Sequence, residues 1–243
     1  MRSRAEIVDE AVELAEDDAC VLWALSVNAV PMRRTYFEAV VDRTPRQIVK
    51  CLARLANAGL LSATDGLLFA IEDEKVRDLI AGRIPESVSA TLASQSLEFG
   101  ATCEEMPEMF FVDHALRAGQ PIQAAERLLN QLPGNDAEEP PIDEDVAASL
   151  LRVFVALQGD DAALGVNLSV GRALVAHCAA HIRPRAWRDL IAALENHPEA
   201  DDSFRSTLQA ADGQFKKRRS VERKKAALAS VQEEALPAES SDD

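Results

Sequence analysis

Aromatic residues make up only 5% of this 243-residue sequence, although hydrophobic residues together make up 47%. Alanine and leucine dominate the apolar side chains, glycine numbers only 10, and runs of β-branched residues are scarce. Such a composition favours helices over sheets. The chain is long enough to bury a core, either as one large domain or as two smaller ones.

Long apolar runs and paired cysteines are also missing. No stretch of 18 apolar residues occurs, so no membrane span is expected, and the first 18 residues carry no apolar signal core. The four cysteines lie far apart with no Cys-x-x-Cys pair, which suits a reducing compartment better than a disulfide framework. We therefore expect a soluble, cytoplasmic protein that does not contact the membrane.

Motifs for catalysis and cofactor binding are absent. The sequence has no Gly-x-Ser-x-Gly, His-Glu-x-x-His or Gly-x-Gly-x-x-Gly. His177 and His181 have the spacing of one helical face, with Cys178 between them and His197 further along. A zinc site needs a third or fourth ligand placed by the fold, so a surface or partly buried pair is the simpler interpretation. We expect no enzyme, no metal site and no cofactor.

Positive charge is scarce overall and concentrated in two places. The formal net charge is −15, which opposes non-specific binding to nucleic acid or anionic membrane. Residues 33–54 nevertheless carry six basic and two acidic side chains, and residues 216–225 carry seven basic and one acidic. These two segments are the places where an anionic ligand or partner is most easily attracted.

The N-terminal part is patterned as helices. Apolar spacing predicts helices over residues 5–14, 19–29 and 34–41, and Pro31 ends the second of them. Thr44-Pro45 is a strong helix start, because threonine caps free N–H groups and proline is tolerated in the first turn.

A short hairpin is predicted directly after the helix that begins at Pro45. Gly59 is placed to end that helix in the left-handed conformation, so we predict a positive φ there. Leu60–Ala63 and Leu67–Ile71 are short enough to be strands, and Asp65-Gly66 is a hairpin turn. Further helices are predicted over residues 73–82 and from Pro85 onward. Three helices with a two-stranded wing are the layout of a winged helix.

Helix pairs are predicted from Phe110 onward. Residues 110–133 place Ala118-Gly119 between two apolar helical patterns, and residues 150–182 repeat the arrangement around Gly159-Asp160. Both segments look like tetratricopeptide-type helical hairpins, without a fixed 34-residue period.

The predicted fold is therefore mainly α, in three parts. Residues 1–98 form a winged-helix domain (three helices plus a short β-hairpin) with flanking helices. Residues 99–213 form a domain of α-helical hairpin repeats, with a Pro-rich acidic linker at 133–145. Residues 214–243 hold a basic segment and an acidic tail that we expect to be disordered.

The order of these parts resembles a segment of the STAND signal-transduction ATPases, including the large LuxR-type regulators. The resemblance lies in DDACVLWALSVNAVPMRRTYFEAVV, IVKCLARLANAGLLSATDGLLFAI, VRDLIAGRIPESVSATL and DHALRAGQPIQAAERLL, a little under half of the chain. It implies a winged helix that serves as a packing arm and leads into tetratricopeptide-like repeats. The phosphate-binding Gly-x-x-x-x-Gly-Lys-[Ser/Thr] loop of those proteins is absent, so ATP hydrolysis is not implied.

One face of the helix starting at Pro45 is basic. Arg46, Lys50 and Arg54 recur every four residues, opposite the apolar Ile48 and Leu52. In a winged helix that reads DNA, the third helix enters the major groove, where Arg or Lys meets guanine or phosphate and Asn meets adenine. The candidate residues for contact with DNA or a partner are Arg43, Arg46, Gln47, Lys50, Arg54, Asn57, Lys216, Lys217, Arg218 and Arg219.

Two functional hypotheses follow. The first is a non-catalytic regulatory or adaptor protein that uses the winged helix and the helical hairpins for protein–protein interaction. The second is a DNA-binding transcriptional regulator that reads DNA through residues 43–57, with the helical region for sensing or for a homodimer. A third option is a piece of a larger ATPase whose motor lies elsewhere. The segment 216–225 suits a phosphate backbone, an acidic partner, or a solvated helix end neutralised by acids such as Glu233.

Overall fold

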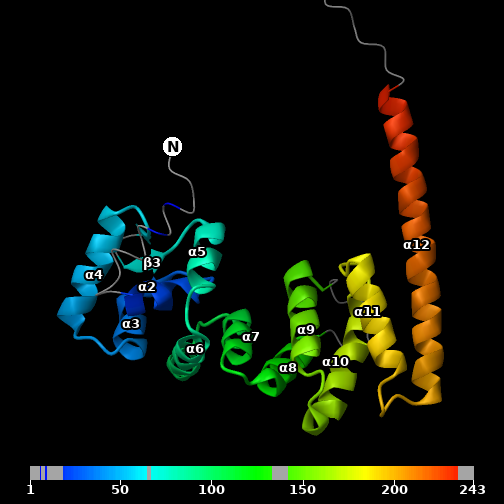
Figure 1. Cartoon of the computed structure of the whole chain (residues 1–243), viewed down its shortest axis with the longest axis horizontal. Helices are drawn as coiled ribbons and strands as arrows, with labels where there is room; N and C mark the ends of the chain where they lie inside the picture. Colours follow the sequence, from blue (N-terminus) through cyan, green and yellow to red (C-terminus); the bar gives the residue numbers. More distant parts are fainter. Residues whose placement is uncertain (1–5, 7–8, 10–18, 65–66, 133–141, 235–243) are drawn as a thin grey trace, which may run out of the picture. The chain divides into compact units, whose positions relative to one another are not determined.

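The computed structural model describes residues 6, 9, 19–64, 67–132 and 142–234, with side chains up to residue 225 (Figure 1). The described chain is mainly helical and divides into two compact units, residues 1–131 and 132–243. Most of the helix predicted over residues 5–14, the Asp65-Gly66 turn, most of the acidic linker and the acidic tail lie outside the described residues.

The first unit begins with helices interleaved with a small sheet. Its first elements in chain order are α2 (Ala19–Ser26), β1 (Met32–Arg33), α3 (Arg34–Val40), α4 (Pro45–Asn57), β2 (Ser62–Thr64) and β3 (Leu68–Ala70). The sheet is antiparallel in the order β1-β3-β2, with Phe69 of β3 opposite both Met32 and Ala63. The sequence predicted the β2–β3 hairpin but not β1, because two residues are too few to show a strand periodicity.

Two further helices complete the core of this unit. Asp73 caps α5 (Glu74–Ala81), where its Oδ1 accepts the N–H groups of Lys75 and Val76, and α6 (Glu86–Gly100) follows Pro85. The helices, β1 and the hairpin enclose one apolar cluster. The largest fully buried members of this cluster are Tyr36, Phe37, Leu22, Leu25, Ile48 and Ile80.

A helical hairpin closes the first unit. Helix α7 (Glu108–Arg117) is followed by α8 (Pro121–Asn130), and Gly119 turns the chain between them with a φ of +72°. Gly100 lets α6 approach α7 closely, because a Cβ at this position would lie 2.8 Å from Cε1 of Phe110. The division of the chain after Gln131 therefore groups this hairpin with the preceding helices, not with the later hairpin as the sequence had suggested.

The second unit is entirely helical in its described part. It comprises α9 (Glu144–Ala156), the 3-10 helix η1 (Asp161–Ala163), α10 (Leu164–His177), α11 (Pro184–Glu195) and α12 (Asp202–Glu234). Gly159, with a φ of +84°, lies in the turn between α9 and α10, as the predicted hairpin required. The basic segment expected to stand apart from residue 214 is part of the single 33-residue helix α12.

Within the described residues, no helix has both the length and the hydrophobicity needed to cross a bilayer.

Candidate interaction surfaces

Helix α4 has a well-defined start and end. The Thr44 hydroxyl accepts the Gln47 N–H at 3.4 Å, and Oε1 of Gln47 accepts the Thr44 N–H at 2.9 Å, which forms a capping box ahead of Pro45. Gly59 ends the helix with a φ of +71°, as predicted. These local signals fix where α4 begins and ends.

The outer face of α4 carries an exposed basic strip, which we define as Arg46, Lys50 and Arg54. Ile48 and Leu55 are buried on the opposite face. The strip is therefore exposed in the described chain and is not covered by the later helices of its own unit.

The other predicted residues near this strip differ in their availability. Arg43 is exposed and donates to the Asp42 carbonyl at 3.2 Å, and Asn57 is exposed in the last turn of α4. The amide oxygen of Gln47 belongs to the capping box, where it accepts hydrogen bonds from the N–H and the hydroxyl of Thr44.

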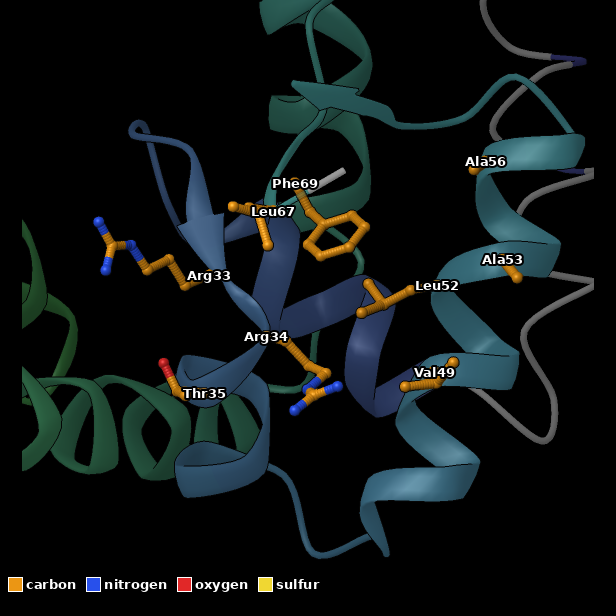
Figure 2. Close-up of a pocket in the computed structure, with 9 residues that line it drawn as sticks. All are labelled: Arg33, Arg34, Thr35, Val49, Leu52, Ala53, Ala56, Leu67 and Phe69. Carbon is orange, nitrogen blue, oxygen red and sulfur yellow. The ribbon is translucent and has the colours of Figure 1, made fainter. Parts of the chain in front are cut away.

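Beside the basic strip lies an apolar depression, the α4–hairpin groove, of about 570 Å³. Figure 2 shows the side chains of α4 on one side of it and those of the hairpin on the other. It is lined by Val49, Leu52, Ala53 and Ala56 of α4, by Leu67 and Phe69 of the hairpin, and by Arg33, Arg34 and Thr35.

Two apolar side chains on this groove are exposed to solvent. Val49 is 46% exposed and Leu67 is 68% exposed. Arg34 stands at the rim, where its Nε lies 2.9 Å from Oε1 of Glu38, and Arg33 is exposed nearby. Figure 2 shows the Arg34 side chain pointing toward α4 and that of Arg33 pointing away from it. An apolar floor with one guanidinium group at its edge suits an apolar side chain that has an acidic neighbour.

Sequence reasoning missed this groove. Val49 adjoins the basic strip in the helical repeat, and that repeat alone does not show which apolar residues lie beside it. Leu67 and Phe69, which line the groove with Val49, belong to the hairpin, and the sequence did not show that the hairpin lies beside this face of α4.

A second depression, the α11–α12 groove of about 620 Å³, lies in the second unit. Its floor is the Trp187 ring stacked on Phe215, with centroids 4.6 Å apart and planes 11° apart. The Trp187 indole N–H donates to Oδ1 of Asp212 at 3.2 Å, which further joins α11 to α12. The remaining lining residues are Pro184, Arg188, Lys216, Arg219, Ser220, Arg223 and Lys224.

Five cationic side chains and one carboxylate line the α11–α12 groove. Nζ of Lys216 lies 2.5 Å from Oδ2 of Asp212, and Arg219 pairs with Glu222 at 3.1 Å. The hydrogen bond from Arg219 lowers the pKa of the Glu222 carboxyl. Of the predicted contact residues on α12, Lys216 and Arg219 belong to this groove.

The other two predicted residues of α12 lie elsewhere on the helix. Lys217 and Arg218 are exposed but do not line the groove, and Arg218 pairs with Glu222 at 3.4 Å. The groove adds cations that the sequence did not single out, most clearly Arg188, which α11 brings to α12 from 28 positions before Lys216.

The histidine pair does not share a helix face, contrary to the sequence prediction. Helix α10 ends at His177, and His181 lies in the turn beyond it, where its N–H donates to the Cys178 carbonyl at 2.9 Å. His197 is buried and accepts the Glu199 N–H on Nδ1 at 3.2 Å. In the part of the chain described, no three His, Cys, Asp or Glu side chains are grouped to hold a metal ion.

A buried polar network in the first unit was also missed. Asn28 donates to the Tyr36 hydroxyl at 2.7 Å and lies 3.0 Å, through Oδ1, from Nε2 of His114. The Tyr36 hydroxyl also lies 2.8 Å from Oγ of Ser96, so the network joins α3 to α6 and α7. Burial, and then the charge of Arg117, lowers the pKa of His114 to about 3, so the imidazole is neutral. We assign the network a packing role, since it opens into neither groove.

No family model matches the chain, and comparison with known proteins and with solved structures likewise finds no match.

Proposed function

We propose that the protein is a non-catalytic regulatory or adaptor protein whose first unit holds a partner protein in the α4–hairpin groove. The order α2-β1-α3-α4-β2-β3 supports a winged-helix interpretation of that unit, with α4 as the third helix and the β2–β3 hairpin as the wing. The groove is the space between those two parts.

The exposure of Val49 and Leu67 at one groove carries this proposal. Isolated exposed apolar residues are ordinary, but two that border the same concave apolar surface are typical of a binding site. A nucleic-acid backbone offers nothing apolar to such a floor, whereas an aliphatic or aromatic side chain of a protein fills it. Arg34 at the rim favours a partner segment that carries an acidic residue beside that side chain.

The test is recovery of a partner with matched variants of the full chain. Tagged protein is added to an extract of its native cells and cross-linked gently. The amount of partner that it recovers is compared with the amount recovered by the variant Val49→Asp/Leu67→Asp. The control is Leu79→Asp/Ile122→Asp, because these are also exposed apolar residues of the first unit, 46% and 36% exposed, away from the groove.

A stoichiometric partner that is lost at least about tenfold with the groove variant and retained with the control supports the proposal, since an interface centre costs more than about 1.4 kcal/mol when disrupted. Equal recovery by both variants, or no partner with the unmodified chain, rejects it. Arg34→Glu should also weaken recovery if the partner segment is acidic.

DNA binding is the second candidate, and the exposed basic strip of α4 favours it. In a winged helix that reads DNA, Arg46, Lys50 and Arg54 would enter the major groove. A selection from random duplex DNA, followed by salt-dependent shift assays, tests this. Replacing all three with Gln should lower both the affinity and the salt slope, because phosphate contacts release counterions. Failure to enrich any sequence, with no shift at low salt, excludes this candidate.

A further inference from the structure

The α11–α12 groove combines a concave shape, an apolar floor and a surplus of cations in a chain whose net charge is −15. Its five cationic side chains face a single lining carboxylate, that of Asp212. Asp212 is itself occupied by the Trp187 N–H and by Lys216. Glu222, outside the lining, pairs with Arg219 at 3.1 Å. The positive charge of the groove is thus only partly offset from within the described residues.

The cations of this groove are arranged along α12. Lys216, Arg219 and Arg223 follow one another at three and four positions, the spacing that places side chains on one helical face. Three such residues span about 10 Å at 1.5 Å per residue. Arg188 and Pro184 of α11 form the opposite wall, so the row of charges borders a channel and not a flat surface.

We propose that the α11–α12 groove binds the backbone of single-stranded nucleic acid. A row of Lys and Arg along a groove is the means by which proteins follow a phosphate backbone, and guanidinium groups pair with phosphate in bidentate fashion. A groove with Lys and Arg side chains along α12 and Arg188 on the opposite wall can contact the phosphates of one strand from two sides. This binding is separate from the partner site of the first unit and does not depend on it.

The floor makes the binding indifferent to base sequence. Trp187 is buried with 1% of its surface exposed, and its ring is already stacked on Phe215. The guanidinium of Arg219 also lies 6.0 Å from the Phe215 ring centroid. With the indole unavailable for a base to stack on, electrostatic contacts dominate, and the affinity follows the number of phosphates neutralised.

The experiment measures binding of the full chain to a fluorescein-labelled single strand by anisotropy. The probes are mixed-sequence RNA and DNA of about 16 nucleotides, the upper end of ordinary single-strand sites, with the matching DNA duplex. Log K should fall with log salt at a slope of up to about −3.5, since each of five contacts contributes about −0.7. RNA and DNA should bind equally within about twofold, because the backbone charge is shared.

Arg223→Gln/Lys224→Gln is the groove variant, and Lys217→Gln/Lys225→Gln is its control, since these exposed lysines lie on the same helix but do not line the groove. Both variants remove two positive charges. The groove variant should lower the slope by about 1.4 and the affinity at 0.1 M salt by about 25-fold. The control should change the affinity by less than about threefold, as a distant charge does through a screened field.

The proposal is overturned if neither single strand binds, if the two variants weaken binding equally, or if the duplex binds more tightly than the single strands. It is also overturned if polyglutamate displaces the single strands at equal charge concentration, because the groove would then be a site for an acidic protein. Helix content by circular dichroism confirms that each variant is folded before its binding is compared.

Discussion

The two grooves of this protein have similar volumes and opposite chemistry. The α4–hairpin groove exposes its apolar side chains and holds cations only at its rim, whereas the α11–α12 groove buries its aromatic floor and lines its walls with cations. A partner of the first groove gains mainly by burying apolar surface, and a ligand of the second gains mainly by neutralising charge. Salt should therefore weaken binding at the second groove strongly and at the first only slightly.

The floors of the two grooves also differ in how much of the fold depends on them. Trp187 is fully buried between α11 and α12, whereas Phe69 is half-buried and meets Phe37 edge-on at 6.2 Å. The second groove therefore exists only while its unit is packed. The first groove has a half-buried ring on its floor, so less of the packing of its unit depends on that ring.

Removing the buried floor should give the largest effect on stability. Trp187→Ala removes a buried indole, its stack on Phe215 and its hydrogen bond to Asp212, so we expect a loss of about 3–5 kcal/mol in the free energy of unfolding. Phe69→Ala should cost less than half as much, because that ring is partly solvated already. Urea unfolding of both variants measures the difference, and equal losses would contradict this account of the two floors.

Glycine substitutions should give opposite signs in the two regions. Gly59 has a φ of +71°, which a Cβ opposes, so Gly59→Ala should cost about 1 kcal/mol and Gly59→Val more. Gly213 lies inside α12 with no atom within 4 Å of an added Cβ, so Gly213→Ala should stabilise the protein by up to about 1 kcal/mol. Melting temperatures test both predictions. An unchanged melting temperature in Gly59→Val would contradict the assignment of a left-handed cap at this position.

The buried network of the first unit should make stability depend on pH. The pKa of His114 is lowered from 6.5 to about 3 in the folded chain, so below pH 6.5 the unfolded chain binds the extra proton. The contribution of neutral His114 to the free energy of unfolding is then fully present above pH 6.5. It is lost as the pH falls toward 3, by about 1.4 kcal/mol per pH unit. His114→Gln should lack this component of the pH dependence between pH 7 and 5. If the unmodified chain and His114→Gln show the same slope of stability against pH, other groups cause the pH dependence.

The sequence predicted local features well and spatial ones poorly. The start of α4, the positive φ at Gly59 and the hairpin turn at Gly159 each depend on residues adjacent in the chain, which is why their patterns were readable. The α4–hairpin groove is lined by both Leu67 and Val49, and the α11–α12 groove is lined by both Arg188 and Arg223. These pairs of residues are brought together by packing between elements, and the periodicity of a single sequence does not show that packing.

The smallest expected effect on stability comes from the basic strip itself. Arg46, Lys50 and Arg54 are exposed, and exposed substitutions usually change stability by within about 0.5 kcal/mol, so replacing all three with Glu should leave the melting temperature nearly unchanged. If α4 reads DNA, the same variant should lose all DNA binding, because three attractive contacts become repulsive. If the α4–hairpin groove holds an acidic partner, recovery of that partner should fall only through the altered local field, less than with Val49→Asp/Leu67→Asp. Stability, DNA shift and partner recovery measured on this one variant therefore separate the two uses of α4, and a large drop in melting temperature would show that the strip is packed against other residues.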